Sequence, residues 1–220
     1  MPTKLVKSTS DPTTANTSAV QYIDNESRWH NTTTGDVFVC VDAAAGTWEL
    51  IHDEADIFED MAVVAGVGIT GTADNFASRV EKVGTLFKTT IVIDIDGLDS
   101  GGTANDIIGA NGAGVAHLGQ ITAARNGTIF AGLMTCLETP TGGDNDIDLW
   151  SATEATGVED TLVTDLTETQ LCNSGDLTNA SRIPLTAFPA ANKYLYIAGG
   201  TGDTQATYTA GILIIELWGK

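Results

Sequence analysis

The chain has 220 residues, of which 42% are apolar, and its 10 Lys and Arg against 29 Asp and Glu give a formal net charge of −19. So acidic a surface repels nucleic acid and anionic membranes, and we expect neither as a partner. The negative charge then serves either to keep the protein soluble or to suit a layer that faces the solvent. The apolar content excludes a disordered chain, and no apolar run approaches the ~20 residues of a membrane-spanning helix.

Residues 1–21 are rich in Thr, Ser, Asp and Asn and are expected to form an extended N-terminal arm, with Leu5 and Val6 as its apolar anchor. Such an arm either crosses onto a neighbouring subunit or is a frayed terminus. The segment lacks the hydrophobic core of a secretory signal, so we expect a protein assembled in a cytoplasm.

Residues 22–52 are expected to form a β-hairpin module. Val37 to Val41 alternate as in a strand, Gly46 turns the chain, and a second strand follows at residues 47–51. Two or three strands over about thirty residues bury too little apolar surface to be stable alone. We therefore expect an anchoring module that docks onto another surface. The expected interface residues are Trp29, Phe38, Trp48, Leu5 and Val6.

Residues 53–74 are expected to be a linker with one short helix. Ile57, Met61 and Val64 recur at helical spacing within residues 53–65, and acidic residues crowd the first turn. A glycine-punctuated loop follows at residues 66–72.

From residue 75 to residue 220 the pattern changes to about eight strands rich in Thr, with few charges inside the apolar runs. We expect a hairpin turn across Arg125, Asn126 and Gly127. Pro184 marks an edge strand, and the run ILIIELWG at residues 212–219 reads as a central, buried strand. With no amphipathic helices between the strands, the pattern predicts an all-β protein: the hairpin module followed by an antiparallel β-sandwich, most closely a jelly roll.

No catalytic or cofactor-binding residues are expected. The chain has no nucleophile elbow and no phosphate-binding P-loop, and its glycine clusters do not open helices. The three histidines have no metal-ligand spacing, and an odd number of dispersed cysteines indicates small buried side chains. These residues are His30, His52, His117, Cys40, Cys136 and Cys172.

Asp144, Asp146 and Asp148 occupy alternate positions in GGDNDID. Alternating carboxylates at a turn are weak candidates for a calcium site because Ca²⁺ prefers hard oxygen ligands, although the EF-hand pattern is not met. The alternative is a solvated hairpin tip, and no metal is expected.

The run GDVFVCVDAAAGTWELI at residues 35–51 resembles a short N-terminal module of tailed-bacteriophage virion proteins. The resemblance covers less than a quarter of the chain. It implies a non-enzymatic virion structural protein, either a capsid decoration (cement) protein or a head fibre that displays an acidic β domain outward. The implied partners are the major capsid protein or other virion proteins, the implied assembly is a homotrimer, and the implied location is the head surface of the virion.

Two other functions remain open. A tail-fibre or receptor-binding adhesin would have the same signature and fold class, and the expected long loops at residues 97–114 and 154–180 leave room to contact a host-surface glycan. A virion-associated glycan hydrolase would need two close carboxylates in a deep cleft.

Overall fold

The computed structural model describes residues 5–8, 10, 12–13, 28–31, 37–42, 45, 47–52, 63–70, 75–201 and 205–220. The chain divides into two compact units, Met1–Asp60 and Met61–Lys220, and each is described here by itself.

The small unit contains one four-stranded sheet in the order β1 (Leu5–Ser8), β2 (Arg28–Asn31), β3 (Val37–Asp42) and β4 (Thr47–His52). Strands β3 and β4 form the expected antiparallel hairpin, whereas β1 runs parallel to β2. Part of the expected N-terminal arm, Leu5–Ser8, is thus a strand of this sheet. The rest of residues 1–21, apart from residues 10 and 12–13, lies outside the described residues.

The described core of the small unit is centred on Cys40, which is fully buried, with Val6 and Trp48 packed against it. The Trp29 and Trp48 rings meet edge to face, with centroids 5.7 Å apart. The Trp29 indole nitrogen also donates a hydrogen bond to the Ser10 carbonyl at 2.7 Å. Two tryptophans therefore supply much of the apolar contact that the described residues make in this sheet.

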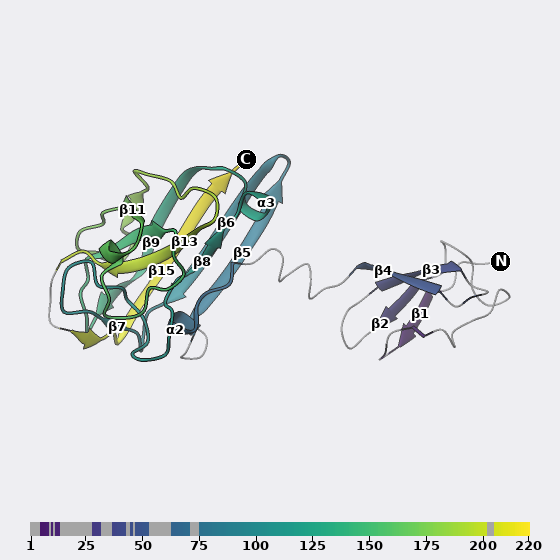
Figure 1. The fold of residues 1–220 in the computed structure, drawn as a ribbon, viewed down its shortest axis with the longest axis horizontal. Coiled ribbons are helices and arrows are strands. Elements are labelled where there is room, and N and C mark those ends of the chain that lie inside the picture. The colour runs from purple at the N-terminus through teal and green to yellow at the C-terminus, as the bar shows by residue number, and fades with distance from the viewer. Residues whose placement is uncertain are drawn as a thin grey trace. The chain divides into compact units, whose positions relative to one another are not determined.

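The large unit contains two larger sheets (Figure 1). The first has the order β12 (Arg182–Pro184), β9 (Ile129–Thr141), β15 (Ala210–Gly219), β6 (Leu86–Asp94) and β5 (Phe76–Val83). The second has the order β11 (Glu168–Cys172), β10 (Ile147–Ala152), β13 (Lys193–Gly199) and β8 (Gly119–Ile121). Smaller elements are β7 (Asp99–Ser100), β14 (Ala206–Thr207), α2 (Val67–Thr70), α3 (Ala123–Asn126) and the 3-10 turn η1 (Val163–Asp165).

Strand pairing in the large unit is antiparallel and nested along the chain. The innermost pair is β10 with β11, followed outward by β9 with β12, β8 with β13, and β6 with β15. The pairs β9–β15 and β10–β13 complete the two sheets. The predicted all-β, antiparallel class is confirmed.

The two large sheets share one hydrophobic core. Strand β15 contributes Leu213, Ile215 and Leu217 from the first sheet, while Leu149 and Ile197 come from the second; all five are fully buried. Inward residues alternate with outward ones because successive side chains of a strand point to opposite faces. The predicted central position of the last strand and the edge position of the Pro184 strand are both correct.

Two local expectations differ from the structure. Residues 63–70, expected in the linker, belong to the large unit: Val63 is buried in its core, and Gly66 and Gly68 donate backbone hydrogen bonds to His117 and Val115. Residues 63–66 are not helical, α2 follows at Val67, and residues 53–62 lie outside the described part of the chain.

The expected hairpin across residues 125–127 is wrong, because α3 occupies these residues and joins strands of different sheets.

Candidate functional site

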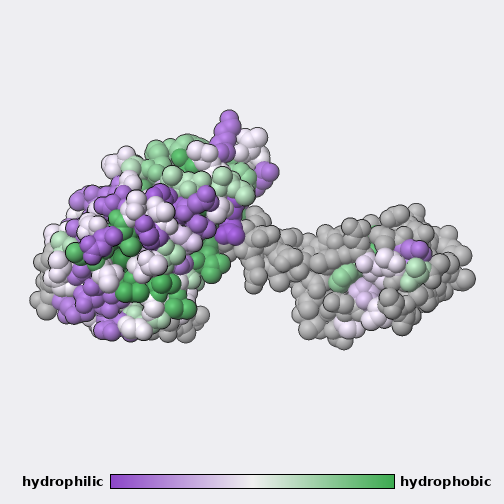
Figure 2. Space-filling model, viewed as in Figure 1, coloured by the Kyte–Doolittle hydropathy of each residue, from purple (hydrophilic) through white to green (hydrophobic). Residues whose placement is uncertain are grey.

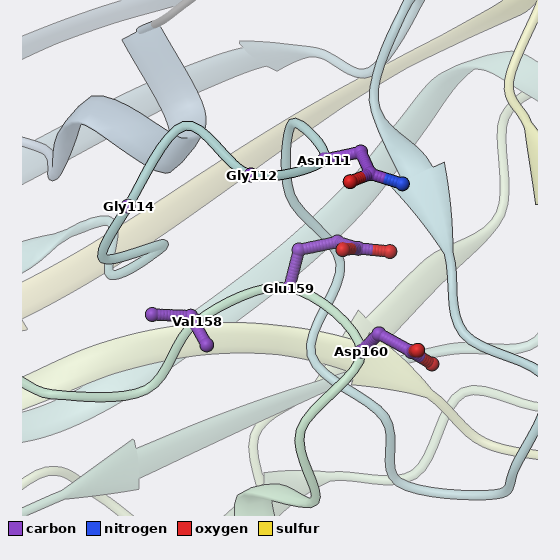
Figure 3. Close-up of a pocket in the computed structure, with 6 residues that line it drawn as sticks. All are labelled: Asn111, Gly112, Gly114, Val158, Glu159 and Asp160. Carbon is purple, nitrogen blue, oxygen red and sulfur yellow. The ribbon is translucent and has the colours of Figure 1, made fainter.

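The candidate site is a cavity of about 380 Å³ between two loops of the large unit. One loop lies between β7 and β8, and the other lies between β10 and η1. The side chains of Asn111, Glu159 and Asp160 extend to the same side of the loops, as Figure 3 shows. The lining residues are Asn111, Gly112, Gly114, Val158, Glu159 and Asp160.

Backbone hydrogen bonds hold these two loops together. Val115 and Val158 form an isolated antiparallel bridge, and the Ala116 amide donates to the Gly157 carbonyl at 2.8 Å. The Thr161 hydroxyl donates to the Val158 carbonyl at 2.6 Å, which closes the turn that carries Glu159. The cavity is therefore formed by fixed backbone, as expected for a binding site that exists before its ligand arrives.

The cavity is acidic. Burial raises the pKa of Glu159 above its usual range, and the charges of Asp160, Asp99 and Asp106 raise it further. The Gln205 side-chain amide opposes the rise by donating to Glu159 at 3.2 Å. An anionic ligand such as a phosphate would meet repulsion here.

The lining groups define what the cavity can bind. Two carboxylates accept hydrogen bonds, the Asn111 carboxamide both donates and accepts, and none of the six lining residues is aromatic. This set fits a neutral ligand with several hydroxyl groups.

The sequence predicted that these two loops could contact a ligand, but it did not identify the lining residues. The two loops come together only through the pairing of residues 115 and 158, which are distant in sequence.

The three aspartates proposed as weak calcium ligands are buried, with exposed fractions of 3%, 7% and 1% for Asp144, Asp146 and Asp148. Their carboxylates accept hydrogen bonds from the protein. Asp144 accepts from Thr201 and from the backbone of Asp146, while Asp148 accepts from the Gln170 side chain and the Ser174 amide, both at 2.7 Å.

Protein donors that already engage these carboxylates count against the calcium interpretation. The Ser174 hydroxyl lies 3.4 Å from Asp146, and the Gly175 backbone also donates to that carboxylate. Among the residues that the structure describes, no group of three or more His, Cys, Asp and Glu side chains is arranged to hold a metal ion. The alternating acids are buried and hydrogen-bonded within the protein, so the alternative of a solvated hairpin tip is wrong. A role of these acids as calcium ligands gains no support from this geometry.

Stability is expected to fall as the pH rises from about 4 towards neutrality. Burial raises the pKa of Asp148, and the charges of Asp146 and Asp144 raise it further against the opposing hydrogen bonds. The folded state then holds the Asp148 proton more tightly than the unfolded state, so this contribution is complete below the unfolded pKa and is lost as the pH passes the folded pKa. Urea unfolding of Asp148→Asn should show a weaker decline with pH than the wild type.

The matched control for that measurement is Asp96→Asn, which removes an exposed carboxylate. Its pH dependence should follow that of the wild type. An Asp148→Asn variant whose stability declines with pH as steeply as the wild type would contradict the prediction.

The five expected interface residues lie in the small unit. Trp29, Trp48 and Val6 belong to its own core, as described above, and Phe38 is partly buried on β3. The Leu5 side chain lies outside the described residues. A role of these residues in docking stays a prediction.

The dispersed histidines and cysteines are divided between the two units. His30 and His52 belong to the small unit, whereas His117 belongs to the large unit, where its ring lies 4.9 Å from that of Tyr194. Cys40, Cys136 and Cys172 are buried, which confirms the expectation of small buried side chains.

Compared with protein-family models, with curated proteins and with solved structures, the chain matches none of them. The described helices include none that is long and apolar enough to cross a membrane.

Proposed function

We propose that this chain is a non-enzymatic structural protein of a tailed-bacteriophage particle, a capsid decoration (cement) protein or a head fibre. In this proposal the module at residues 22–52 attaches the chain to the head, and the large unit is displayed outward. The partners are the major capsid protein or other virion proteins, and the location is the head surface.

The observation that carries the proposal is the division of the chain into two units. The run that resembles the phage module coincides with the β3–β4 hairpin of the small unit. Its described core is one small cluster around Cys40, whereas the large unit has a core shared by two sheets. A small sheet whose described core is this limited gains stability by packing onto a larger body, as an attachment module would.

The strand order of the large unit supports a display domain. The nested pairing that folds β6 onto β15 and ends at the β10–β11 hairpin is the order that a doubly folded hairpin produces, which supports the jelly-roll class as part of this proposal. Jelly rolls occur in viral capsid and lectin domains, which is an analogy of fold. A homotrimer is part of the proposal through the resemblance alone.

Deleting residues 1–52 tests the proposal. Cosedimentation with heads of the phage that encodes the chain should fall to background, since the attachment module is gone, while circular dichroism should show a folded β domain. The full-length chain is the control. Normal binding of the truncated, folded protein would exclude attachment through this module.

The cavity at Asn111, Glu159 and Asp160 favours a second function, a tail-fibre or receptor-binding adhesin that contacts a host-surface glycan. Its carboxylates and carboxamide suit sugar hydroxyl groups, and it lies in the two loops expected to carry such contacts. Immunogold labelling of virions separates the two functions, because a decoration protein places gold on the head and an adhesin places it on the tail.

A further inference from the structure

The outward face of the five-stranded sheet carries an apolar surface that no described element covers. Strand β15 alternates along its length: Leu213, Ile215 and Leu217 point into the core, and Ile212 and Ile214 on the opposite face are partly exposed. Trp218 shares that outward face. A central strand in a sheet exposed on one side normally alternates apolar with polar residues, and β15 departs from this pattern.

Neighbouring strands extend the apolar surface sideways. Residues directly opposite one another in an antiparallel pair share a face, so Ile214 lies between Val92 of β6 and Thr135 of β9. In the same way Trp218 lies between Lys88 and Ala131. We call this surface the outer face. Its residues are Ala77, Arg79, Glu81, Lys88, Thr90, Val92, Asp94, Ala131, Leu133, Thr135, Glu138, Arg182, Pro184, Ile212, Ile214, Glu216 and Trp218.

The four-stranded sheet of the large unit, β11-β10-β13-β8, differs, because the chain covers both of its faces. Every residue of β10 is buried. On β13 the Tyr196 side chain is fully buried, and its hydroxyl donates to the Glu154 carbonyl at 2.8 Å. A methyl group added at Gly157 would meet the side chains of Ile107 and Tyr196, which shows how closely the loops pack there. Of the two larger sheets of the large unit, the five-stranded sheet is the one whose outward face has no such cover among the described residues.

The charges of the outer face nearly cancel, and four of them are paired within it. Arg79 contacts Glu81 at 2.8 Å, and Lys88 pairs with Glu216 while its ammonium group lies 5.6 Å from the centre of the Trp218 ring. The outer face carries three basic and four acidic residues, whereas residues 61–220 as a whole have seven Lys and Arg against 18 Asp and Glu. The acidic excess of this unit therefore lies almost entirely elsewhere.

We propose that a second copy of this chain packs on the outer face. Two copies with a net charge of −19 repel each other over most of their surfaces, and a nearly neutral apolar patch is where that repulsion is weakest. A basic partner would instead be drawn to the acidic remainder of the surface. A hollow of about 320 Å³ lies beside the bulkier Ile214, so side chains of one copy could fit into the hollow of the other when two outer faces pack together. The hollow is lined by Ala77, Ser78, Arg79, Glu81, Thr90 and Val92.

The size of the outer face fits a reversible pair. Five strands about 4.8 Å apart and about seven residues long cover roughly 500–600 Å² per copy. Two such faces bury roughly 1,000–1,200 Å², at the lower end of specific interfaces, so association should depend on protein concentration. Face-to-face packing closes with a two-fold axis, whereas the phage resemblance implies a trimer. The inference does not depend on the proposed virion function, but the dimer would replace the homotrimer that the resemblance implies.

Sedimentation velocity of the full chain tests this inference. Between about 1 and 200 µM the wild type should pass from monomer to dimer, and added salt should favour the dimer by screening the repulsion between acidic surfaces. Ile214→Lys places an unpaired charge at the centre of the interface and should raise the concentration at the midpoint by at least about tenfold. Leu133→Lys is an independent second variant on β9.

Val67→Lys is the matched control, because it charges an exposed apolar residue of α2 that is not part of the outer face. It should dimerise like the wild type. At a protein concentration well below the dimerisation midpoint, thermal melts of all three variants should match that of the wild type, which separates dissociation from unfolding. A wild type that is monomeric throughout, a trimer, or a dimer that both Ile214→Lys and Leu133→Lys leave intact would overturn the proposal.

Discussion

Replacing Gly219 with alanine is expected to destabilise the large unit by about 3 kcal/mol and to lower its melting temperature by roughly 6–12 °C. A Cβ atom at this position would lie 1.8 Å from the Asn126 carbonyl oxygen, far inside van der Waals contact. Gly219 pairs with Ile129 on one side and Phe87 on the other. The strand therefore cannot move away without losing pairing on both sides.

The Asn126 carbonyl is fixed as well. The backbone amide of Asn126 donates to Thr122 at 2.8 Å, and Thr128 and Lys220 exchange two backbone hydrogen bonds next to the clash. Relief would require breaking several of these bonds, which is why the expected loss is large.

Gly84→Ala is the control for Gly219→Ala. Gly84 lies in the β5–β6 turn at φ +65°, and a Cβ atom there would meet no heavy atom within 4 Å. Its expected loss is the cost of a left-handed backbone for alanine, about 1 kcal/mol. Thermal melts that show Gly219→Ala to be no less stable than Gly84→Ala would contradict the predicted clash.

Elements that are specified by a short stretch of sequence were predicted correctly. Alternation and turn residues identify the β3–β4 hairpin, Pro184 identifies an edge strand, and the apolar run at residues 212–219 identifies a central strand. Each signal reflects side-chain periodicity or a missing backbone donor, both of which can be read within about ten residues.

The sequence could not predict features that depend on distant partners. Asn126 and Gly127 look like a hairpin turn, and Gly127 does have the positive φ that such a turn uses. The chain forms α3 instead, since Thr122 caps it and the Asn126 side chain is engaged in the core. The cavity could not be predicted for the same reason. Glu159 and Asp160 lie near the glycines of the other loop only because residues 115 and 158 pair.

The apolar run of β15 predicted a central strand correctly, but it also carries information about the outward face of that strand. We expected a central, buried strand, and the structure buries one face fully while leaving Ile212, Ile214 and Trp218 partly exposed. Continuous apolar sequence in a strand covered on one side by its own chain indicates that something else covers the other side. The proposed pairing of two outer faces supplies that cover without bringing acidic surfaces together.

Removing the Asn126 side chain is the second change with a large expected effect. Asn126 is fully buried, its amide nitrogen donates to the Thr89 hydroxyl at 2.8 Å, and its oxygen accepts from the Thr122 amide at 2.9 Å. Asn126→Leu keeps the branched shape of the side chain, with somewhat larger bulk, but leaves these buried groups without that partner. We expect a loss of about 2–3 kcal/mol in urea unfolding.

A double-mutant cycle with Thr89→Val separates the hydrogen bond from packing. Thr89→Val alone leaves the buried Asn126 amide nitrogen without its acceptor and should cost about 1–2 kcal/mol. Once Asn126 is leucine, the threonine hydroxyl has lost its partner, so adding Thr89→Val should cost less, and the double variant should be about 1 kcal/mol more stable than the sum of the single losses predicts. Additive losses would mean that the hydrogen bond between α3 and β6 contributes nothing to stability, and that Asn126 acts there through its contact with Thr122 alone.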